Sequence, residues 1–371
     1  MYLTSTNIAH YLLQRGRLAP EAIVNGDLLV TEAGRRNRNF KVIQKKFPPG
    51  LFVKQIRTPE AQAMITLQRE STCYRLAQSG EEYRALAKLM PRFVDYDPAR
   101  CVLVLELLPD AMNLSEHHQR LQKFPEEIGE MLGRGLGTYH SDAGRAFSMQ
   151  TDKSTFACMP PWILSLHASG PAMFQQLSGG NTRLIEVLRQ APAFAQRLEE
   201  LRQEWRSETL THGDIKWENC MVFPAADGKL DFRIVDWELC DIGDPAWDAG
   251  SVLQSYLVWW IFSMPVHSES QPGRFIEQAG HKLEDMQPAM RMFWNSYRNA
   301  RGLSQQDSDA LLLRCVRYGA ARMVQTAFEQ LHIAPQLNNY AVTLLQVSLN
   351  ILNEPWQAAK DLFGLPAGKT Q

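Results

Sequence analysis

The stretch LTHGDIKWENCMVFPAADGKLDFRIVDW, residues 210–237, places three oxygen-bearing side chains around a short loop and a hairpin. Asp214 and Asn219 lie five positions apart, and two apolar runs follow, the second of which ends on Asp236. The turn between these runs, Pro224–Lys229, contains Asp-Gly, a strong signal for a β-hairpin. We therefore expect Asp214, Asn219 and Asp236 to surround one small volume.

The side-chain types in this stretch favour one kind of chemistry. Carboxylate and amide oxygens are hard ligands that suit Mg²⁺, an ion that takes few protein ligands and fills its shell with water and phosphate oxygens. A carboxylate left outside that shell can accept a proton from an attacking hydroxyl. Such a set of groups indicates phosphoryl transfer.

The chain resembles the aminoglycoside phosphotransferase and choline kinase family in three motifs. One is His-Gly-Asp-x-x-x-x-Asn, beginning at His212; the second is Ile-Val-Asp-Trp-Glu at residues 234–238; the third is Gly-Asp-Pro-Ala-Trp-Asp at residues 243–248. The resemblance implies an α+β, bilobal fold like that of protein kinases, with a small antiparallel-sheet N-lobe and a larger, mostly helical C-lobe. It divides the chain into residues 1–108 and residues 109–371.

The same resemblance implies roles for residues of the quoted stretch. Asp214 would orient or deprotonate the acceptor hydroxyl, and Asn219 and Asp236 would bind Mg²⁺. Lys216 stands where the small-molecule kinases commonly have His or Gln; it would either reach the γ-phosphate and stabilise its charge or face solvent. Glu238 would either approach a metal-bound water or serve the fold.

Two aspartates of the third motif are expected to support the site rather than to act in it. Asp244 and Asp248 should cap the following helix and brace the catalytic loop by hydrogen bonds, because Asp favours helix N-termini. We interpret the buried-looking His140 and the pair Trp259-Trp260 as core residues.

A lysine and a glutamate of the N-terminal region are candidates for nucleotide binding. Lys54 lies in an apolar strand, where a charge needs a partner, and resembles the strand lysine that holds the α- and β-phosphates. Lys45 and Lys46 are weaker candidates. The partner carboxylate on the next helix is Glu70 by family position, with Glu60 as the alternative.

Main-chain groups should provide further nucleotide contacts. Gly34 and Asn37 lie in a turn that resembles the tip of the family's nucleotide-covering hairpin, although a solvated turn has the same composition. The apolar run Cys101–Leu108 predicts a buried strand that leads into the hinge, where the backbone of Glu106 to Leu108 would read the base. The nucleotide would be ATP or GTP.

Periodicity predicts the order of the elements. The N-terminal region should contain a leading helix, a hairpin, the lysine strand, a helix and two further strands. The predicted ranges are 7–16, 27–33, 40–44, 51–56, 60–78, 93–97 and 101–108. Helices should fill the remainder, at 127–140, within 160–205, and at 251–264, 290–297, 310–331 and 340–352.

Composition limits the class of protein. The chain has 371 residues, 45% hydrophobic and 21% charged, with a net charge of −1, which is typical of a soluble globular protein and gives no support to nucleic-acid binding. We expect no signal peptide and no membrane span, since the longest apolar run, 256–262, is far too short. Six cysteines without CxxC spacing predict reduced thiols in the cytoplasm. The oligomeric state stays open.

The resulting hypothesis is a Mg²⁺-dependent phosphotransferase that moves the γ-phosphate of ATP or GTP to a hydroxyl of a small molecule. Lys216 favours a rival, a peptide or protein Ser/Thr kinase, because Asp-x-Lys-x-x-Asn is the protein-kinase form of this loop. A second rival is a pseudokinase that binds nucleotide without turnover. The short interval from Asp236 to Asp248 favours a small acceptor, held by residues 160–180 and 251–301.

Overall fold

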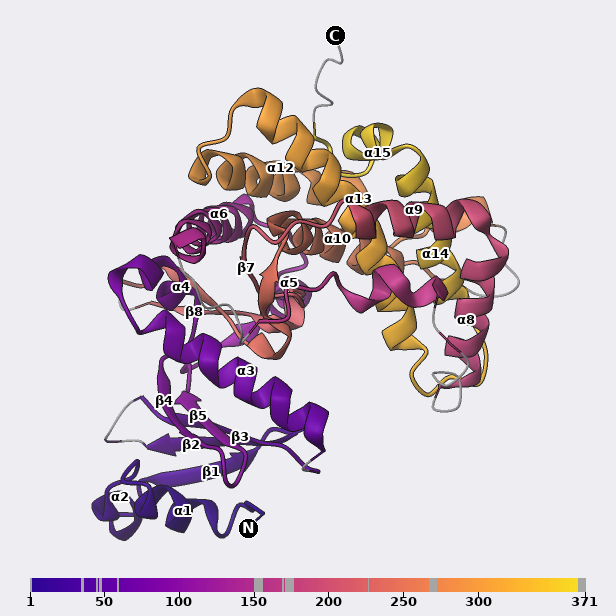
Figure 1. The fold of residues 1–371 in the computed structure, drawn as a ribbon. Coiled ribbons are helices and arrows are strands. Elements are labelled where there is room, and N and C mark those ends of the chain that lie inside the picture. Colours follow the sequence, from indigo (N-terminus) through magenta and orange to yellow (C-terminus); the bar gives the residue numbers. More distant parts are fainter. Residues whose placement is uncertain are drawn as a thin grey trace. The chain divides into compact units, whose positions relative to one another are not determined.

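The computed structural model describes residues 2–34, 37–44, 46, 49–58, 60–149, 156–168, 170, 177–225, 227–266 and 272–365. They form two compact units, one of Met1–His117 with Glu218–Cys240 and one of His118–Trp217 with Asp241–Gln371. Packing therefore assigns residues 218–240 to the N-terminal unit, whereas the single boundary after residue 108 stays a prediction. Figure 1 shows the elements of both units.

An antiparallel sheet forms the centre of the first unit, with the strand order β1-β2-β3-β5-β4. Figure 1 shows α3 on one face of this sheet and α1 on the other. The leading helix packs its apolar side chains against alternate residues of the strands, which leaves Lys54 of β3 on the opposite face. The elements are α1 Ile8–Gln14, α2 Pro20–Val24, β1 Leu28–Glu32, β2 Arg38–Gln44, β3 Leu51–Gln55, α3 Ala61–Ala77, η1 Glu81–Tyr83, α4 Arg84–Leu89, β4 Phe93–Asp97 and β5 Val102–Glu106.

A second, three-stranded sheet contains the predicted hairpin. It consists of β6 Met112–Asn113, β8 Cys220–Pro224 and β9 Leu230–Ile234, followed by η4 Trp237–Leu239. Ala225 N donates to Lys229 O at 2.7 Å and Gly228 N donates to Ala225 O at 2.9 Å, so the Asp-Gly turn closes as expected.

Helices form most of the second unit. They are α5 Leu114–Leu121 (which begins in the first unit), α6 Glu126–Met149, η2 Trp162–Ala168, α8 Gly179–Gln190, α9 Pro192–Gln203, α10 Pro245–Phe262, α11 Pro272–Glu277, α12 Leu283–Ala300, α13 Gln305–Gln330, α14 Asn339–Asn353 and α15 Pro355–Asp361. Two short strands, β7 Thr209–Thr211 and β10 Asp241–Gly243, pair with each other. Over the residues described, no helix combines the length and the apolar character required to cross a membrane.

The predicted helix 127–140 is longer in the structure. It continues to Met149 because Ala143, Ala146 and Phe147 extend the buried stripe by two turns. The expectation that it ends at His140 is wrong, since no helix-terminating residue follows there.

Glycines allow two pairs of helices to pack closely. A Cβ atom added at Gly133 of α6 would lie 2.2 Å from the carbonyl oxygen of Phe293 in α12. A Cβ atom added at Gly250 of α10 would lie 2.3 Å from the carbonyl oxygen of Cys315 in α13. The second crossing brings α13 against the helix that follows the catalytic loop.

Candidate active site

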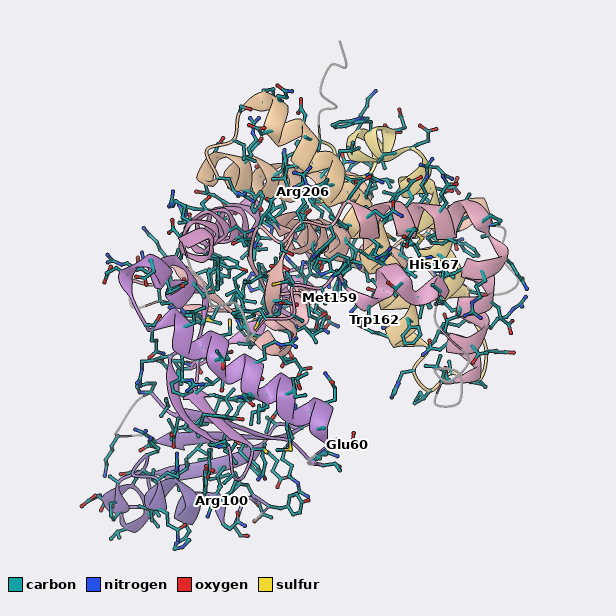
Figure 2. The ribbon with its side chains drawn as sticks, in the orientation of Figure 1. Glu60, Arg100, Met159, Trp162, His167 and Arg206 are labelled. Carbon is teal, nitrogen blue, oxygen red and sulfur yellow. The ribbon has the colours of Figure 1, made fainter. Side chains whose placement is uncertain are left out.

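A buried lysine links three carboxylates in the first unit. Lys54 Nζ lies 2.8 Å from Glu70 Oε2, 2.5 Å from Asp236 Oδ1 and 3.5 Å from Glu238 Oε2. The predicted contact of Lys54 with Glu70 is confirmed. Glu60, labelled in Figure 2, is exposed ahead of the first turn of α3, so the alternative partner is wrong.

The phase of α3 explains why Glu70 meets the lysine. Leu67, Glu70, Tyr74 and Ala77 are buried at intervals of three or four residues, which places all of them on one face of the helix. Glu70 is therefore directed inward with the apolar residues, and the exposed fraction of this residue is 1%.

This cluster has an excess of negative charge. Glu70, Asp236 and Glu238 each place a carboxylate oxygen within 3.5 Å of the single Lys54 ammonium, so acidic groups outnumber the lysine in this cluster. Burial disfavours the charged form of Lys54, but Glu70, Asp236 and Glu238 outweigh it and raise the pKa of the ammonium. Burial also raises the pKa of Glu70 to about 7, against the opposing effect of Lys54. Such a site attracts a cation.

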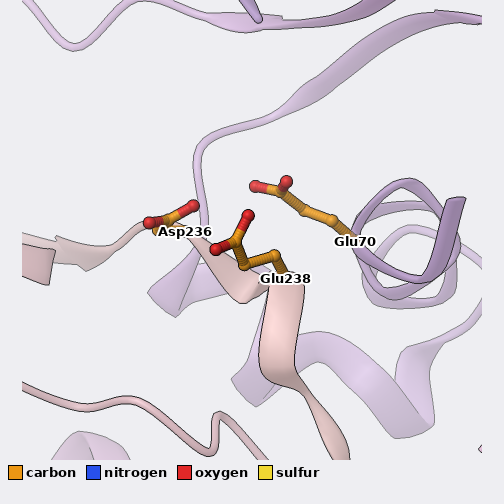
Figure 3. Close-up of side chains that lie close together, drawn as sticks. All are labelled: Glu70, Asp236 and Glu238. Carbon is orange, nitrogen blue, oxygen red and sulfur yellow. The ribbon is translucent and has the colours of Figure 1, made fainter. Parts of the chain in front are cut away.

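The carboxylates also have the spacing that a metal ion needs. One oxygen from each of Glu70, Asp236 and Glu238 lies within 4.8 Å of the others, and Figure 3 shows the three side chains converging. Oxygen donors of this kind suit Mg²⁺. Of the two predicted ligands only Asp236 belongs to this cluster, and the binding of a metal by Asn219 and Asp236 stays a prediction.

The hairpin holds the two predicted metal ligands near its open end. Asn219 O accepts a hydrogen bond from Val235 N at 2.9 Å, so Asn219 lies opposite the residue that precedes Asp236. Asp236 has a φ of 67°, and the buried Trp237 donates from Nε1 to Ile234 O at 2.8 Å. This tight turn directs the Asp236 side chain back towards Lys54. The expectation that Asp214 joins these two residues stays a prediction.

The catalytic loop in the second unit holds Asp214 between two cations. Asp214 Oδ1 accepts from Arg322 Nη2 at 3.0 Å, and Oδ2 accepts from Lys216 Nζ at 2.8 Å. Burial disfavours the ionised form of Asp214, but Arg322 and Lys216 outweigh it and lower the pKa of the carboxyl group. Burial opposes the charge of Lys216 as well, but Asp214 raises the pKa of this ammonium.

The expected bracing of this loop is confirmed. Asp248 accepts from His212 N at 2.7 Å and from Gly213 N at 3.0 Å, while Asp244 caps α10 by accepting from Ala246 N at 2.9 Å. Gly213 has a φ of 81°, which favours glycine at this position. The loop is therefore fastened to the N-terminus of α10.

Arg322 is a residue that sequence reasoning missed. It lies on α13, 108 positions after Asp214, and the exposed fraction of its side chain is 1%. The signal in the sequence was a single arginine between Ala320-Ala321 and Met323-Val324 in an otherwise apolar stretch. Since buried charges are almost always paired, this arginine implied an acidic partner.

The structure places the remaining predicted nucleotide contacts as follows. Gly34 and Asn37 lie in the connection between β1 and β2, where a Cβ atom on Gly34 would come within 2.3 Å of Asn37 O; the neighbouring residues 35 and 36 lie outside the described residues. Glu106 ends β5 and Leu108 follows it. Their contacts with a nucleotide stay predictions.

The remaining residues that the sequence singled out, two lysines and three aromatic side chains, have the following surroundings. Lys46 forms an ion pair with Asp27 at 3.2 Å, and Lys45 lies outside the described residues. His140 is buried and hydrogen-bonded to Tyr297 Oη at 2.9 Å. Trp259 packs on Trp217 with ring centroids 5.3 Å apart. The interpretation as core residues is confirmed for His140 and Trp260, which are buried, whereas Trp259 is half-buried.

The sequence of this chain is similar to that of one known protein family. Residues 27–293 match the model of the phosphotransferase enzyme family. No curated protein sequence matches the chain at a significant level.

Solved structures share the fold at low sequence identity. An ethanolamine kinase from Plasmodium vivax is 12% identical, with a TM-score of 0.59 over 92% of this chain and 87% of that one. A choline kinase from Cryptosporidium parvum is 13% identical, with a TM-score of 0.56 over 97% and 98%. The GDP complex of an aminoglycoside 2'-phosphotransferase is 15% identical, with a TM-score of 0.51 over 95% and 98%. The predicted α+β, kinase-like fold is confirmed.

Proposed function

Since the chain belongs to the phosphotransferase enzyme family, we propose that it transfers the γ-phosphate of ATP or GTP to a hydroxyl of a small molecule. The observation that supports this most directly is the buried Lys54, which contacts both Glu70 and Asp236. A lysine held in this way is suited to neutralise the non-transferred phosphates.

The nucleotide side of the proposed reaction uses the first unit. Asn219 and Asp236 would hold Mg²⁺, which neutralises phosphate charge when bound, and Glu238 has an oxygen within 4.8 Å of one of Asp236. The contacts proposed to cover the nucleotide and to read its base are those of Gly34, Asn37, Glu106 and Leu108.

The acceptor side uses the catalytic loop. Asp214 would receive the hydrogen bond of the acceptor hydroxyl and, as the transfer proceeds, its proton. Because its pKa is lowered, Asp214 is a weak base, and its main contribution is to orient the hydroxyl. Lys216 would exchange its contact with Asp214 for the transferred phosphate.

The interval after Asp236 supports a small acceptor. Residues 237–248 are occupied by η4, β10 and the first turn of α10, and Asp244 caps that helix. A protein kinase uses a long segment here to present a peptide. The structures with the same fold include kinases named for ethanolamine, for choline and for aminoglycosides, which are amine-bearing alcohols. We propose that the acceptor of this protein is likewise a small hydroxyl-bearing molecule and not a peptide.

The experiment is to incubate the purified protein with Mg²⁺ and either ATP or GTP, together with ethanolamine, choline, kanamycin or a library of hydroxylated metabolites. Mass spectrometry should find one acceptor that gains a single phosphate while nucleoside diphosphate accumulates. The Asp214→Asn variant is the control. Nucleotide binding without any product from the library would favour the pseudokinase alternative.

A further inference from the structure

Asp214 has two cationic partners that differ in how firmly they are held. Lys216 belongs to the same loop, two residues away, and 34% of its side chain is exposed. Arg322 projects from α13, and 1% of its side chain is exposed. Since a part-exposed lysine on a four-carbon stem is mobile and a buried arginine is not, only one of these cations is free to change partners.

The surroundings of Arg322 indicate that it is present for Asp214. Within the described part of the chain, Arg322 Nε and Nη1 are buried without a hydrogen-bond partner. The guanidinium carbon lies 5.7 Å from the centroid of the Trp247 ring, and Trp247 Nε1 donates to Gly213 O at 2.9 Å. Among the described groups, Asp214 Oδ1 is the carboxylate oxygen within ion-pair distance of this guanidinium, at 3.0 Å. Its ion pair with Asp214 is the interaction that compensates its charge.

The helix crossing makes this contact rigid. Gly250 of α10 and Gly319 of α13 bring the two helix backbones into contact, and Arg322 follows Gly319 by about one turn. Trp247 precedes Gly250 by the same interval on α10. The guanidinium is therefore buried beside the Trp247 ring where α10 and α13 approach most closely, which restricts its freedom to leave Asp214.

We propose that Arg322 is a positioning residue, which remains bound to Asp214 Oδ1 and holds the carboxylate in place while Lys216 leaves Oδ2 for the transferred phosphate. This inference rests on the proposed function. In this step Oδ2 accepts the hydrogen bond of the acceptor hydroxyl in place of that of Lys216. The acceptor oxygen forms its bond to the γ-phosphorus as the bond to the bridging oxygen breaks, nucleoside diphosphate leaves with that electron pair, and the acceptor proton passes to Asp214 Oδ2.

The charged groups near Asp214 define what a pH measurement would report. Arg322 and Glu329 come from α13, Asp248 comes from α10, and His212 and Lys216 belong to the loop itself. Arg322 keeps its charge throughout the accessible pH range. Replacing Arg322 with an uncharged residue should therefore change the pH at which Asp214 titrates.

The test compares Arg322→Gln and Arg322→Lys with Arg314→Gln. Arg314 lies on the same helix with 12% of its side chain exposed, and its ion pair is with Asp244 at 3.2 Å. Carboxyl ¹³C NMR, with the Asp214 signal assigned from Asp214→Asn, should show Asp214 titrating at higher pH in Arg322→Gln and near the wild-type pH in Arg322→Lys. Arg314→Gln should lower the melting temperature and leave this titration unchanged.

Turnover provides the second readout. In Arg322→Gln, kcat should fall by about tenfold to hundredfold because the carboxylate is no longer fixed, and the acid limb of kcat/KM should move to higher pH. The affinity for Mg·ATP should change little, and Arg322→Lys should recover part of the rate.

Other outcomes separate the two proposals. If Arg322→Gln only loses stability, as Arg314→Gln does, with an unchanged Asp214 titration and pH profile, Arg322 is a structural residue and the inference is wrong. If the wild-type protein transfers no phosphate, the proposed function fails, whereas the NMR titration still decides whether Arg322 controls Asp214. Should Arg322→Gln not fold, Arg322→Met, which removes the charge and keeps an unbranched side chain, gives the same comparison.

Discussion

At the scale of single residues, Asp214 combines burial with a lowered pKa. Burial alone would favour the protonated form, and the opposite direction results from Arg322 and Lys216. In the proposed reaction this carboxylate would orient the acceptor hydroxyl, and its two cationic partners favour its ionised form. We therefore expect a substitution of Asp214 to impair mainly the orientation of the acceptor hydroxyl.

Replacing Asp214 with Asn should lower kcat by about a hundredfold to ten-thousandfold, because the amide cannot accept the acceptor proton. Binding of Mg·ATP should survive, since the change preserves the shape of the side chain. Initial rates and calorimetric titration would measure the two effects. Asp227→Asn, in the exposed hairpin turn, is the matched control. Turnover close to that of the wild type would remove Asp214 from the proposed role.

Asp236 supplies the second prediction at this scale. Asp236→Ala should weaken Mg²⁺-dependent nucleotide binding by roughly tenfold or more and lower turnover as well, because a metal ligand and a partner of Lys54 are lost together. Titrating the protein with ATP in the presence of Mg²⁺, with and without EDTA, would measure the change in nucleotide affinity. Asp231→Ala, on strand β9 of the same hairpin, removes a part-exposed carboxylate paired with Arg233 and should have no such effect. Equal Mg·ATP affinity in Asp236→Ala and Asp231→Ala would contradict the assignment.

At the scale of elements, close helix packing positions the loop and its partners. The glycines of α6 allow contact with the backbone of α12, and Gly250 of α10 does the same for α13. Helix propensity disfavours glycine by about 1 kcal/mol relative to alanine. Packing therefore has to outweigh propensity at these positions.

Gly133→Ala tests which effect wins. The new Cβ atom would meet the carbonyl oxygen of Phe293 at 2.2 Å, so the two helices must separate, and we expect a loss of about 1–3 kcal/mol in the free energy of unfolding. Gly144→Ala on the same helix is the control, because its Cβ atom would have its nearest neighbour at 3.4 Å. Chemical denaturation should show destabilisation only in Gly133→Ala. Equal stability of the two variants would contradict the packing argument.

His140 links three helices and provides a prediction about pH. It lies on α6, 2.9 Å from Tyr297 Oη of α12 and 3.4 Å from Asp248 Oδ2 of α10. Burial outweighs Asp248 and holds the pKa of the imidazole below its ordinary value of 6.5. The unfolded chain therefore binds a proton more readily than the folded one, and stability should fall as the pH drops below 6.5 and level off below the folded-state pKa.

His140→Gln should remove this part of the pH dependence. Urea denaturation at pH values on both sides of the ordinary histidine pKa would measure it, as the difference between wild type and variant. An exposed histidine, His10, substituted in the same way is the control. A wild-type dependence that persists in His140→Gln would show that another group is responsible.

At the scale of the whole molecule, the chain forms two compact units that each hold part of the proposed chemistry. Lys54, Glu70, Asn219 and Asp236 belong to the first unit, and Asp214 with its two cations belongs to the second. The chain passes between the units at residues 117–118, 217–218 and 240–241. The last passage comes one residue after η4, and only residues 237–247 separate Asp236 from Asp248.

We therefore predict that casein and myelin basic protein will not be phosphorylated, and that activity will need no prior phosphorylation of the enzyme. Radiolabelled ATP and gel analysis would measure transfer to either protein, before and after phosphatase treatment of the enzyme. A generic Ser/Thr kinase is the positive control. Robust transfer by the untreated enzyme would overturn the small-molecule acceptor and support the alternative that Lys216 suggests.

The sequence by itself determined the strands around the site and its local turns, but not all of the helices: α2, α4, α5, α11 and α15 were not predicted, and α12 at 283–300 is longer than the predicted 290–297. The hairpin at residues 220–234, the strand that carries Lys54 and the loop before Asn219 follow from apolar periodicity and turn residues, which act over a few positions. The order of these motifs was sufficient to identify the family.

Tertiary structure alone decided which distant groups meet. Arg322 contacts Asp214 across 108 positions because α13 crosses α10 at Gly250, and no periodicity within either segment encodes that crossing. The length of α6 and the assignment of residues 218–240 to the N-terminal unit have the same origin. Contacts between elements far apart in the sequence depend on how the faces of helices and sheets pack against each other. Local sequence patterns do not specify which faces meet.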